Sequence, residues 1–139
     1  MPGKLMDYFN KAPRLGTLST ASKQGNVNAA VFGSPRMMDE KTVVMGLGKD
    51  RSLHYLQENP HAVFLIMEPG KSLMEWKGIR VYLKMKNAAT SGPKLDDYKG
   101  QMTKAFGPDA AKMVHAAVTF EVTEVRPLVD MGQGWEKSI

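Results

Sequence analysis

The chain has 139 residues, of which 42% are hydrophobic and 24% charged, as expected of one folded domain with a single core. It contains no cysteine, which excludes disulfide bonds, thiolate nucleophiles and cysteine-ligated metals. No stretch is apolar over the length that a membrane span requires, and residues 1–9 lack the apolar segment of a signal peptide. We therefore expect one cytoplasmic domain, residues 1–139, without a membrane segment.

The formal net charge is +5, which is clearly basic. Such a charge is compatible with binding to nucleic acid, with binding to a phosphorylated small molecule, or with solubility alone. The lysines and arginines are scattered along the chain rather than gathered in one block. This scatter argues against a dedicated DNA-binding face.

The N-terminal half predicts a short helix followed by a hairpin. The first dozen residues have an apolar side formed by Leu5, Met6 and Phe9. Leu15–Ser22 and Val27–Phe32 are extended in character, and the polar turn between them contains a glycine. In the second of these segments Val27, Ala29 and Val31 share one face, while Asn28, Ala30 and Phe32 share the other.

A strand, a helix and a second strand are predicted next. Thr42–Leu47 is β-branched and apolar, and a helix is expected from about Asp50 to Asn59, where Pro60 ends it. Ala62–Met67 is a continuous apolar run, which predicts a strand buried on both faces.

The C-terminal half predicts two strands separated by helices. Ile79–Met85 alternates between apolar and polar residues, as does the segment around Val118–Thr123. Between them a helix is expected from Pro93 to Phe106, with Leu95, Tyr98 and Met102 on one stripe, followed by a helical piece over Pro108–His115. About six strands with short helices favour a mainly β fold: a small antiparallel barrel with peripheral helices.

The step from Gly46 to Ser52 has the parts of a phosphate site. Glycines at 46 and 48 let backbone N–H groups approach a ligand, the helix start offers free donors, and Lys49 and Arg51 supply positive charge. The alternative is a plain strand-to-helix turn with solvated charges, since neither Walker A nor GxGxxG spacing is present. Asp50 would repel a phosphate unless it turns away to cap the helix.

Three passages together resemble a known family: LGTLSTASKQGNVNAAVFG, TVVMGLGKDRSLHYLQENPHAVFLIM and GIRVYLKMK. Their order and spacing, from about Leu15 to Met85, are similar to those of the pyridoxamine 5′-phosphate oxidase-like FMN-binding split-barrel proteins. The resemblance implies a six-stranded antiparallel split β-barrel, a homodimer, and one non-covalent FMN in each of two clefts at the dimer interface.

The resemblance also implies a set of cofactor-binding residues. The phosphate position matches Arg51 and Ser52. The isoalloxazine ring would lie along the strand Asn28–Phe32 and against the backbone of the strand Met45–Gly48. The partner subunit would contribute from the segment Trp76–Arg80. The remaining cofactor-binding residues expected on this basis are Asn28, Ala29, Ala30, Val31, Met45, Gly46, Leu47, Gly48 and Lys77.

One departure from the family bears on the substrate. Pyridoxamine phosphate oxidases carry an Arg-x-His pair near the C-terminus, whereas this chain ends GWEKSI. We therefore expect FMN but not pyridoxamine phosphate.

Several side chains have two interpretations. Asn28 is either an amide for the pyrimidine edge of the flavin or a polar residue on an open strand face. Lys77 and Arg80 either tune a flavin or end a surface strand, and Trp135 either covers the ring or anchors the tail. The three histidines set no metal-ligand spacing, so no metal site is expected.

The sequence thus predicts an FMN-binding oxidoreductase that passes electrons between a reduced donor and an unknown small-molecule substrate or electron-transfer partner. It leaves open whether the protein turns over or only carries flavin. One alternative is a basic barrel that binds single-stranded nucleic acid through Arg80, Tyr82, Lys84 and Lys86 near Trp76. Another is a haem- or F420-binding relative of the same barrel.

Overall fold

A computed structural model describes residues 3–139. The seven strands are β1 (Gly16–Ala21), β2 (Val27–Val31), β3 (Arg36–Asp39), β4 (Thr42–Leu47), β5 (His61–Glu68), β6 (Lys77–Ala89) and β7 (Ala116–Pro127). The helices are α1 (Lys4–Asn10), α2 (Arg51–Glu58), α3 (Pro93–Phe106) and α4 (Pro108–Lys112), with 3₁₀ turns η1 (Leu73–Glu75) and η2 (Trp135–Ser138). Residues 1 and 2, part of the predicted first helix, lie outside the described residues. Among residues 3–139, no helix combines the length and apolar composition needed to cross a bilayer.

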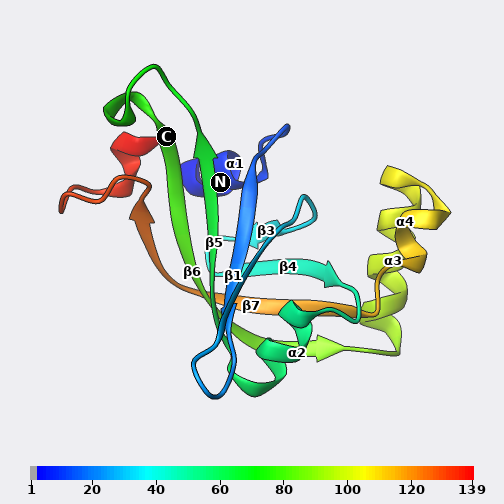
Figure 1. Ribbon diagram of the computed structural model, residues 1–139. Coiled ribbons are helices and arrows are strands. Elements are labelled where there is room, and N and C mark those ends of the chain that lie inside the picture. The colour runs from blue at the N-terminus through cyan, green and yellow to red at the C-terminus, as the bar shows by residue number, and fades with distance from the viewer. Residues whose placement is uncertain (1–2) are drawn as a thin grey trace.

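The strands form one antiparallel sheet in the order β2-β1-β5-β6-β7-β4-β3. The long strands β6 and β7 bend, so that β3 and β4 cross behind β1 and β5 (Figure 1). The pairing of β6 with β7 shifts register between Tyr82 and Leu83 and again between Met85 and Asn87. Such irregularities increase local bending and twist, which curls the sheet toward a barrel that is open between its two edge strands, β2 and β3.

The predicted mainly β, antiparallel class with peripheral helices is confirmed, but the sheet has seven strands rather than six. The additional strand is β3, in a stretch for which no strand was predicted. Its four residues are too few to show an alternating pattern, and β3 exists because it pairs with β4.

The hairpin of β1 and β2 is confirmed, with pairing that runs from Thr17–Val31 to Ala21–Val27. The expectation that β5 is buried on both faces is wrong. Ala62, Phe64 and Ile66 are buried, whereas the residues between them are partly exposed. Only one face of β5 is turned to the core, because no layer formed by residues 3–139 covers the other face.

The core fills the inside of the curled sheet. Phe9 from α1 packs against Phe64 with ring centroids 5.5 Å apart. Arg14 lies over both rings, and its guanidinium donates to the backbone carbonyls of Phe9, Gly33 (3.0 Å) and Pro35 (2.7 Å). This arginine therefore ties the segment before β1 to the β2–β3 loop.

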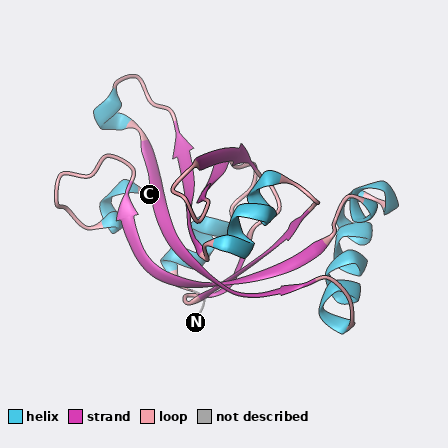
Figure 2. Ribbon diagram, turned by 60° about the horizontal axis from the view of Figure 1, so that its bottom comes forward, coloured by secondary structure: helices cyan, strands magenta, loops and turns pink. Residues whose placement is uncertain are grey.

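The helices α3 and α4 lie at one end of the sheet and project from it (Figure 2). They attach through a small separate cluster formed by Leu95, Val114 and Ala117, with Tyr98 and Met102 partly buried beside it. The boundaries of α3 are as predicted, and the predicted apolar stripe faces this cluster. Helix α4 is shorter than expected, because it ends at Lys112 rather than at His115.

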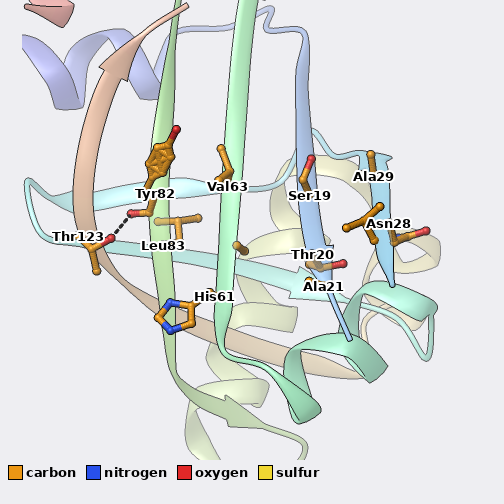
Figure 3. Close-up of a pocket in the computed structure, with 12 residues that line it drawn as sticks. Ser19, Thr20, Ala21, Asn28, Ala29, His61, Val63, Tyr82, Leu83 and Thr123 are labelled. Carbon is orange, nitrogen blue, oxygen red and sulfur yellow. Dashed lines mark hydrogen bonds between the residues drawn. The ribbon is translucent and has the colours of Figure 1, made fainter. Parts of the chain in front are cut away.

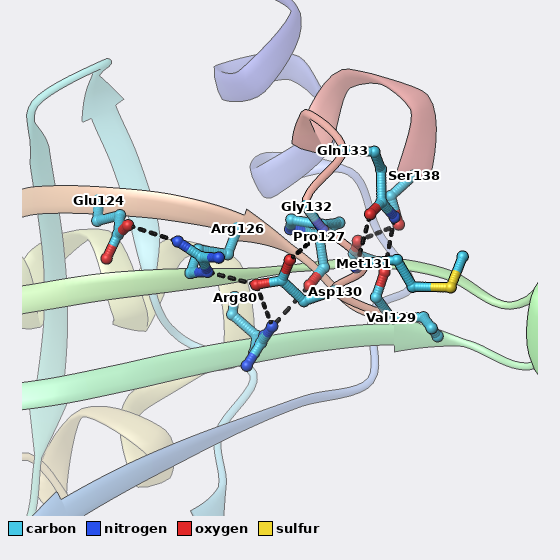
Figure 4. Close-up of polar contacts among 11 residues, drawn as sticks. Arg80, Glu124, Arg126, Pro127, Val129, Asp130, Met131, Gly132, Gln133 and Ser138 are labelled. Atoms are coloured by element: carbon cyan, nitrogen blue, oxygen red, sulfur yellow. Dashed lines mark hydrogen bonds and ion pairs between the residues drawn. The ribbon is translucent and has the colours of Figure 1, made fainter.

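The C-terminal tail is held by a cluster of charges (Figure 4). Asp130 accepts hydrogen bonds from Arg126, from Arg80 (3.0 Å) and from the backbone N–H of Gly132 (3.1 Å). Farther along, the hydroxyl of Ser138 donates to the carbonyl of Gly78 at 2.7 Å. Trp135 packs against the main core, as expected of a tail anchor.

This cluster predicts an acid-sensitive part of the stability. The hydrogen bond from Arg126, with that from Gly132, holds the pKa of Asp130 below its usual range. A carboxylate whose pKa is depressed by folding stabilises the fold above its unfolded pKa of about 3.9, and this contribution is lost as the pH falls below that value. We expect Asp130→Asn to reduce the difference between urea unfolding midpoints measured at about pH 6 and about pH 2.5. Asp109→Asn, at an exposed position on α4, is the control, and an equal reduction in both variants would contradict the prediction.

Candidate functional site

The candidate site begins at the corner where β4 passes into α2. The helix starts at Arg51, and the carboxylate of Asp50 accepts from the backbone N–H of Leu53 at 2.9 Å. Asp50 is therefore the helix cap, one of the two roles weighed for it, and it uses one of the free donors of the helix start. The side chain of Arg51 is exposed, and it makes no ion pair within residues 3–139.

Two predicted cofactor residues from distant parts of the sequence meet at this corner. The amide Nδ2 of Asn28, on β2, lies 3.3 Å from the hydroxyl of Ser52, and Ser52 is only 2% exposed. Thr20 pairs with Asn28 across the hairpin, so the two side chains share a face of the sheet. The Thr20 hydroxyl is buried and has no partner among the described residues. Thr20, Asn28 and Ser52 therefore form a small polar cluster, in which the Thr20 hydroxyl has no partner among residues 3–139.

The predicted residues of β4 divide into two groups. The side chains of Met45 and Leu47 are buried in the main core, so these residues can meet a ligand only through their backbone. Gly46 lies between them on the outer face of β4, and Gly48 follows directly after the strand. A Cβ at Gly46 would lie 2.5 Å from the ring of Tyr98, and one at Gly48 would lie 3.1 Å from the carbonyl of Met113. The ring of Tyr98 therefore leaves no room for a side chain at Gly46, and the carbonyl of Met113 leaves little room at Gly48.

Of the other predicted residues of β2, Ala29 and Val31 face the open side of the sheet together with Val27, but Ala30 does not. Val27 and Val31 are 79% and 69% exposed, and Ala29 is exposed between them, whereas Ala30 is half-buried on the opposite face. Asn28 and Ala29 help to line a shallow cavity of about 470 Å³ that extends across β1, β5 and β6 (Figure 3). His61 and Tyr82 contribute to the same surface.

Lys77 does not join the other predicted residues within one chain. It begins β6 opposite Glu68, whereas the end of β5 that follows α2 pairs His61 with Lys84. Seven residues of extended strand separate Lys77 from Lys84, or about 23 Å. A role for Lys77 at this corner therefore requires a second copy of the chain.

The alternative nucleic-acid face is partly neutralised. Arg80 pairs with Asp130 at 3.0 Å, and Lys86 lies 3.9 Å from Glu121. Two of the three cations expected to follow a nucleic-acid backbone thus already face carboxylates. This geometry gives the nucleic-acid interpretation no support.

Two features were not predicted from the sequence. One is the packing of the Tyr98 ring on Gly46. The other is the burial of the Thr20 hydroxyl beside Asn28 without a partner among residues 3–139. Tyr98 was predicted only as part of an apolar helix stripe, and Thr20 lies within the predicted extended segment Leu15–Ser22 without being singled out. No sequence signal marks either, because each depends on a contact between separate elements. Within residues 3–139, no group of histidines and carboxylates is arranged to hold a metal.

Comparison with known proteins extends this picture. No protein-family model and no curated protein matches the chain. Among solved structures, an FMN-binding protein from Syntrophomonas wolfei subsp. wolfei has 23% identity and a TM-score of 0.72, over 89% of this chain and 82% of that one. The heme storage protein HutZ from Vibrio cholerae has 18% identity and a TM-score of 0.65, over 98% and 99% of the two chains. A putative pyridoxamine 5′-phosphate oxidase from Lactobacillus delbrueckii has 15% identity and a TM-score of 0.61, over 88% and 91%.

These likenesses assign the fold. The chain has the split β-barrel fold of the FMN-binding and pyridoxamine 5′-phosphate oxidase-like proteins, and the resemblance inferred from its sequence is confirmed at that level. The same fold carries different cofactors in the proteins compared, so the choice among them has to come from the residues of this chain.

Proposed function

We propose that this chain binds FMN non-covalently and passes electrons through it, as a homodimer. The observation that carries the proposal is the contact between Asn28 and Ser52, because it joins the strand expected along the flavin ring to the helix start expected at the phosphate. The exposed cation of Arg51 stands at the same helix start.

The residues of this chain suit a phosphate-bearing flavin. Arg51 supplies charge-assisted hydrogen bonds, while the hydroxyls of Ser52 and Thr20 supply neutral ones. Asn28 offers a paired donor and acceptor to the pyrimidine edge of the flavin ring. Bound flavin would supply the redox chemistry, so no side chain of this chain is assigned as acid or base.

A second copy of the chain completes the proposed site. Lys77 lies too far from α2 to reach it in one chain, and the exposed valines of β2 form an apolar surface that a partner would cover. A cation from the partner near the pyrimidine edge would favour the anionic reduced flavin. We therefore assign Lys77 to the flavin of the opposite subunit.

The proposal is tested by absorption spectroscopy. Purified protein is incubated with FMN, desalted and scanned, and its mass is measured by light scattering. We expect a retained flavin spectrum with one FMN per chain in a dimer. Colourless protein after desalting would refute flavin binding, whereas a yellow monomer would refute only the role of the second subunit.

The cap at Asp50 gives a prediction in which stability and affinity change in opposite directions. Its negative charge lies beside the proposed phosphate, while its side chain caps α2. Asp50→Ala should lower the free energy of unfolding by about 1 kcal/mol through loss of the cap. The same change should tighten FMN binding, because it removes a like charge. Asp50→Asn keeps a capping side chain, so it should tighten binding with little loss of stability. Weaker FMN binding in both variants would place the phosphate away from this helix start.

A second candidate function is haem binding, which His61 favours. This histidine is exposed and lines the cavity on the open face of the sheet, where it is free to act as an axial ligand. The same spectrum distinguishes the two cofactors after addition of hemin. A Soret band that is lost in His61→Ala, together with no uptake of FMN, would replace the flavin proposal.

A further inference from the structure

A second and larger cavity, of about 970 Å³, lies apart from the predicted flavin residues. It is bounded by α3, by the outer faces of β3 and β4, and by the segment before β1. None of the predicted cofactor residues, all of which the structure describes, lines it. Its apolar lining includes Met38, Val44, Met102 and Phe106. A cavity of this size with an apolar floor suits a small organic molecule.

Some polar residues of this cavity are already engaged within the protein. Asn10 exchanges two hydrogen bonds of 2.8 Å with the backbone of Met37. Arg14 donates to three backbone carbonyls. These two side chains therefore shape the wall, but the Nε of Arg14 remains buried without a partner among the described residues. Burial also lowers the pKa of the Arg14 guanidinium, as expected of a cation that has lost water without gaining a carboxylate.

The groups that remain free have a definite chemistry. The hydroxyl of Tyr98 lines the cavity, is buried, and has no hydrogen-bond partner within residues 3–139. A buried hydroxyl without a partner costs free energy that a ligand acceptor would recover. Arg36 and Lys94 are exposed at the rim, and no ion pair involves either within the described chain. The carboxylate of Asp97 is the sole negative group among the lining residues.

We infer that this cavity binds an apolar small molecule that carries one anionic group. The apolar body would lie on Val44 and Met102, and the hydroxyl of Tyr98 would donate to an acceptor of the ligand. The anionic group would face Arg36 and Lys94. The ring of Tyr98 also packs on Gly46, so this tyrosine lies between the cavity and the strand proposed to face flavin. The inference does not depend on flavin binding.

The experiment compares two fluorescent probes with nearly the same aromatic body. Anilinonaphthalene sulfonate carries one negative charge, and phenylnaphthylamine carries none. We expect the sulfonate to bind about tenfold more tightly, since two exposed cations contribute modestly to binding an anion. This preference should disappear in the double variant Arg36→Ala/Lys94→Ala. Equal affinities for the two probes in the wild-type protein would overturn the inference.

Two pairs of variants locate the bound probe. Ala105→Trp places an indole in the cavity from an exposed position on α3, and it should abolish binding, whereas Lys104→Trp on the adjacent residue should not. Tyr98→Phe should weaken binding of the sulfonate several-fold, while Tyr55→Phe on α2 should leave it unchanged. Unchanged binding in Ala105→Trp, with its fold verified by circular dichroism, would place the probe on the open sheet face and refute the site.

The titrations are repeated with FMN present. We expect the probe to bind with the same Kd, because the two sets of residues do not overlap. Complete displacement of the probe by FMN would mean that flavin itself occupies this cavity, which would overturn the inference. Probe affinity that falls as protein concentration rises would mean that a second copy of the chain covers the cavity. That result would also overturn the inference. Neither result depends on whether the wild-type protein retains FMN after desalting, so failure of this inference and failure of the flavin proposal are distinguishable.

Discussion

Replacement of Arg51 by alanine is expected to weaken FMN binding about 10- to 150-fold. The range corresponds to the loss of about 1.5–3 kcal/mol, which is typical of a hydrogen bond to a charged group. Arg51 is exposed at the first position of α2, so its removal should leave the fold intact. The measurement is a fluorescence titration of FMN, whose emission changes when the ring enters a protein.

Two further variants make this result specific. Arg51→Lys keeps the positive charge but loses the planar fork, so it should recover part of the affinity. Arg36→Ala removes another exposed arginine, on β3, and should leave FMN affinity unchanged while it weakens binding of the anionic probe. An Arg51→Ala protein that binds FMN as tightly as wild type would move the phosphate to another part of the chain.

The second large effect is structural: Phe64→Ala should lower the free energy of unfolding by about 3–5 kcal/mol. The ring is fully buried, contacts Phe9, and lies beneath the Arg14 guanidinium, whose carbon is 5.2 Å from the ring centroid. A Cβ at Gly16 would meet the same ring at 2.4 Å, so β1 is built closely against it. Loss of the ring would leave a cavity and remove support from the residue that holds the β2–β3 loop.

Phe64→Leu is the matched control, since it keeps an apolar side chain of similar bulk and should cost less than half as much. Unfolding in urea, followed by tryptophan fluorescence, gives both values. A small decrease in the free energy of unfolding of Phe64→Ala, comparable to that of an exposed substitution such as Lys104→Ala, would contradict this prediction.

Local structure was largely readable from the sequence. The strand Thr42–Leu47 and the helix Pro93–Phe106 have the expected boundaries, because Gly48 follows the strand, and Gly92-Pro93 and Gly107 delimit the helix. The capping role of Asp50, one of two possibilities from the sequence, is observed. The short strand β3 was missed, since four residues carry too little periodicity to separate a strand from a connection.

The candidate site was only partly readable. The family resemblance predicted that Asn28 and Ser52 both bind the cofactor, but the contact between them is a property of the folded chain. The exposed face of β5 was misjudged, because a continuous apolar run looks the same whether one face or two are covered. The large cavity beneath α3 was not anticipated, since its lining comes from five separate segments of the chain.

The sequence by itself determined the order of the helices and of six of the seven strands, and the charged step at the start of α2. Each of these depends on backbone preferences and on side chains only a few positions apart. Only the tertiary structure decided that Tyr98 packs on Gly46, that Thr20 is buried beside Asn28 without a partner among residues 3–139, and that Lys77 lies far from α2. Those facts depend on how strongly the sheet curls and where α3 docks, which are set by packing among residues distant in sequence.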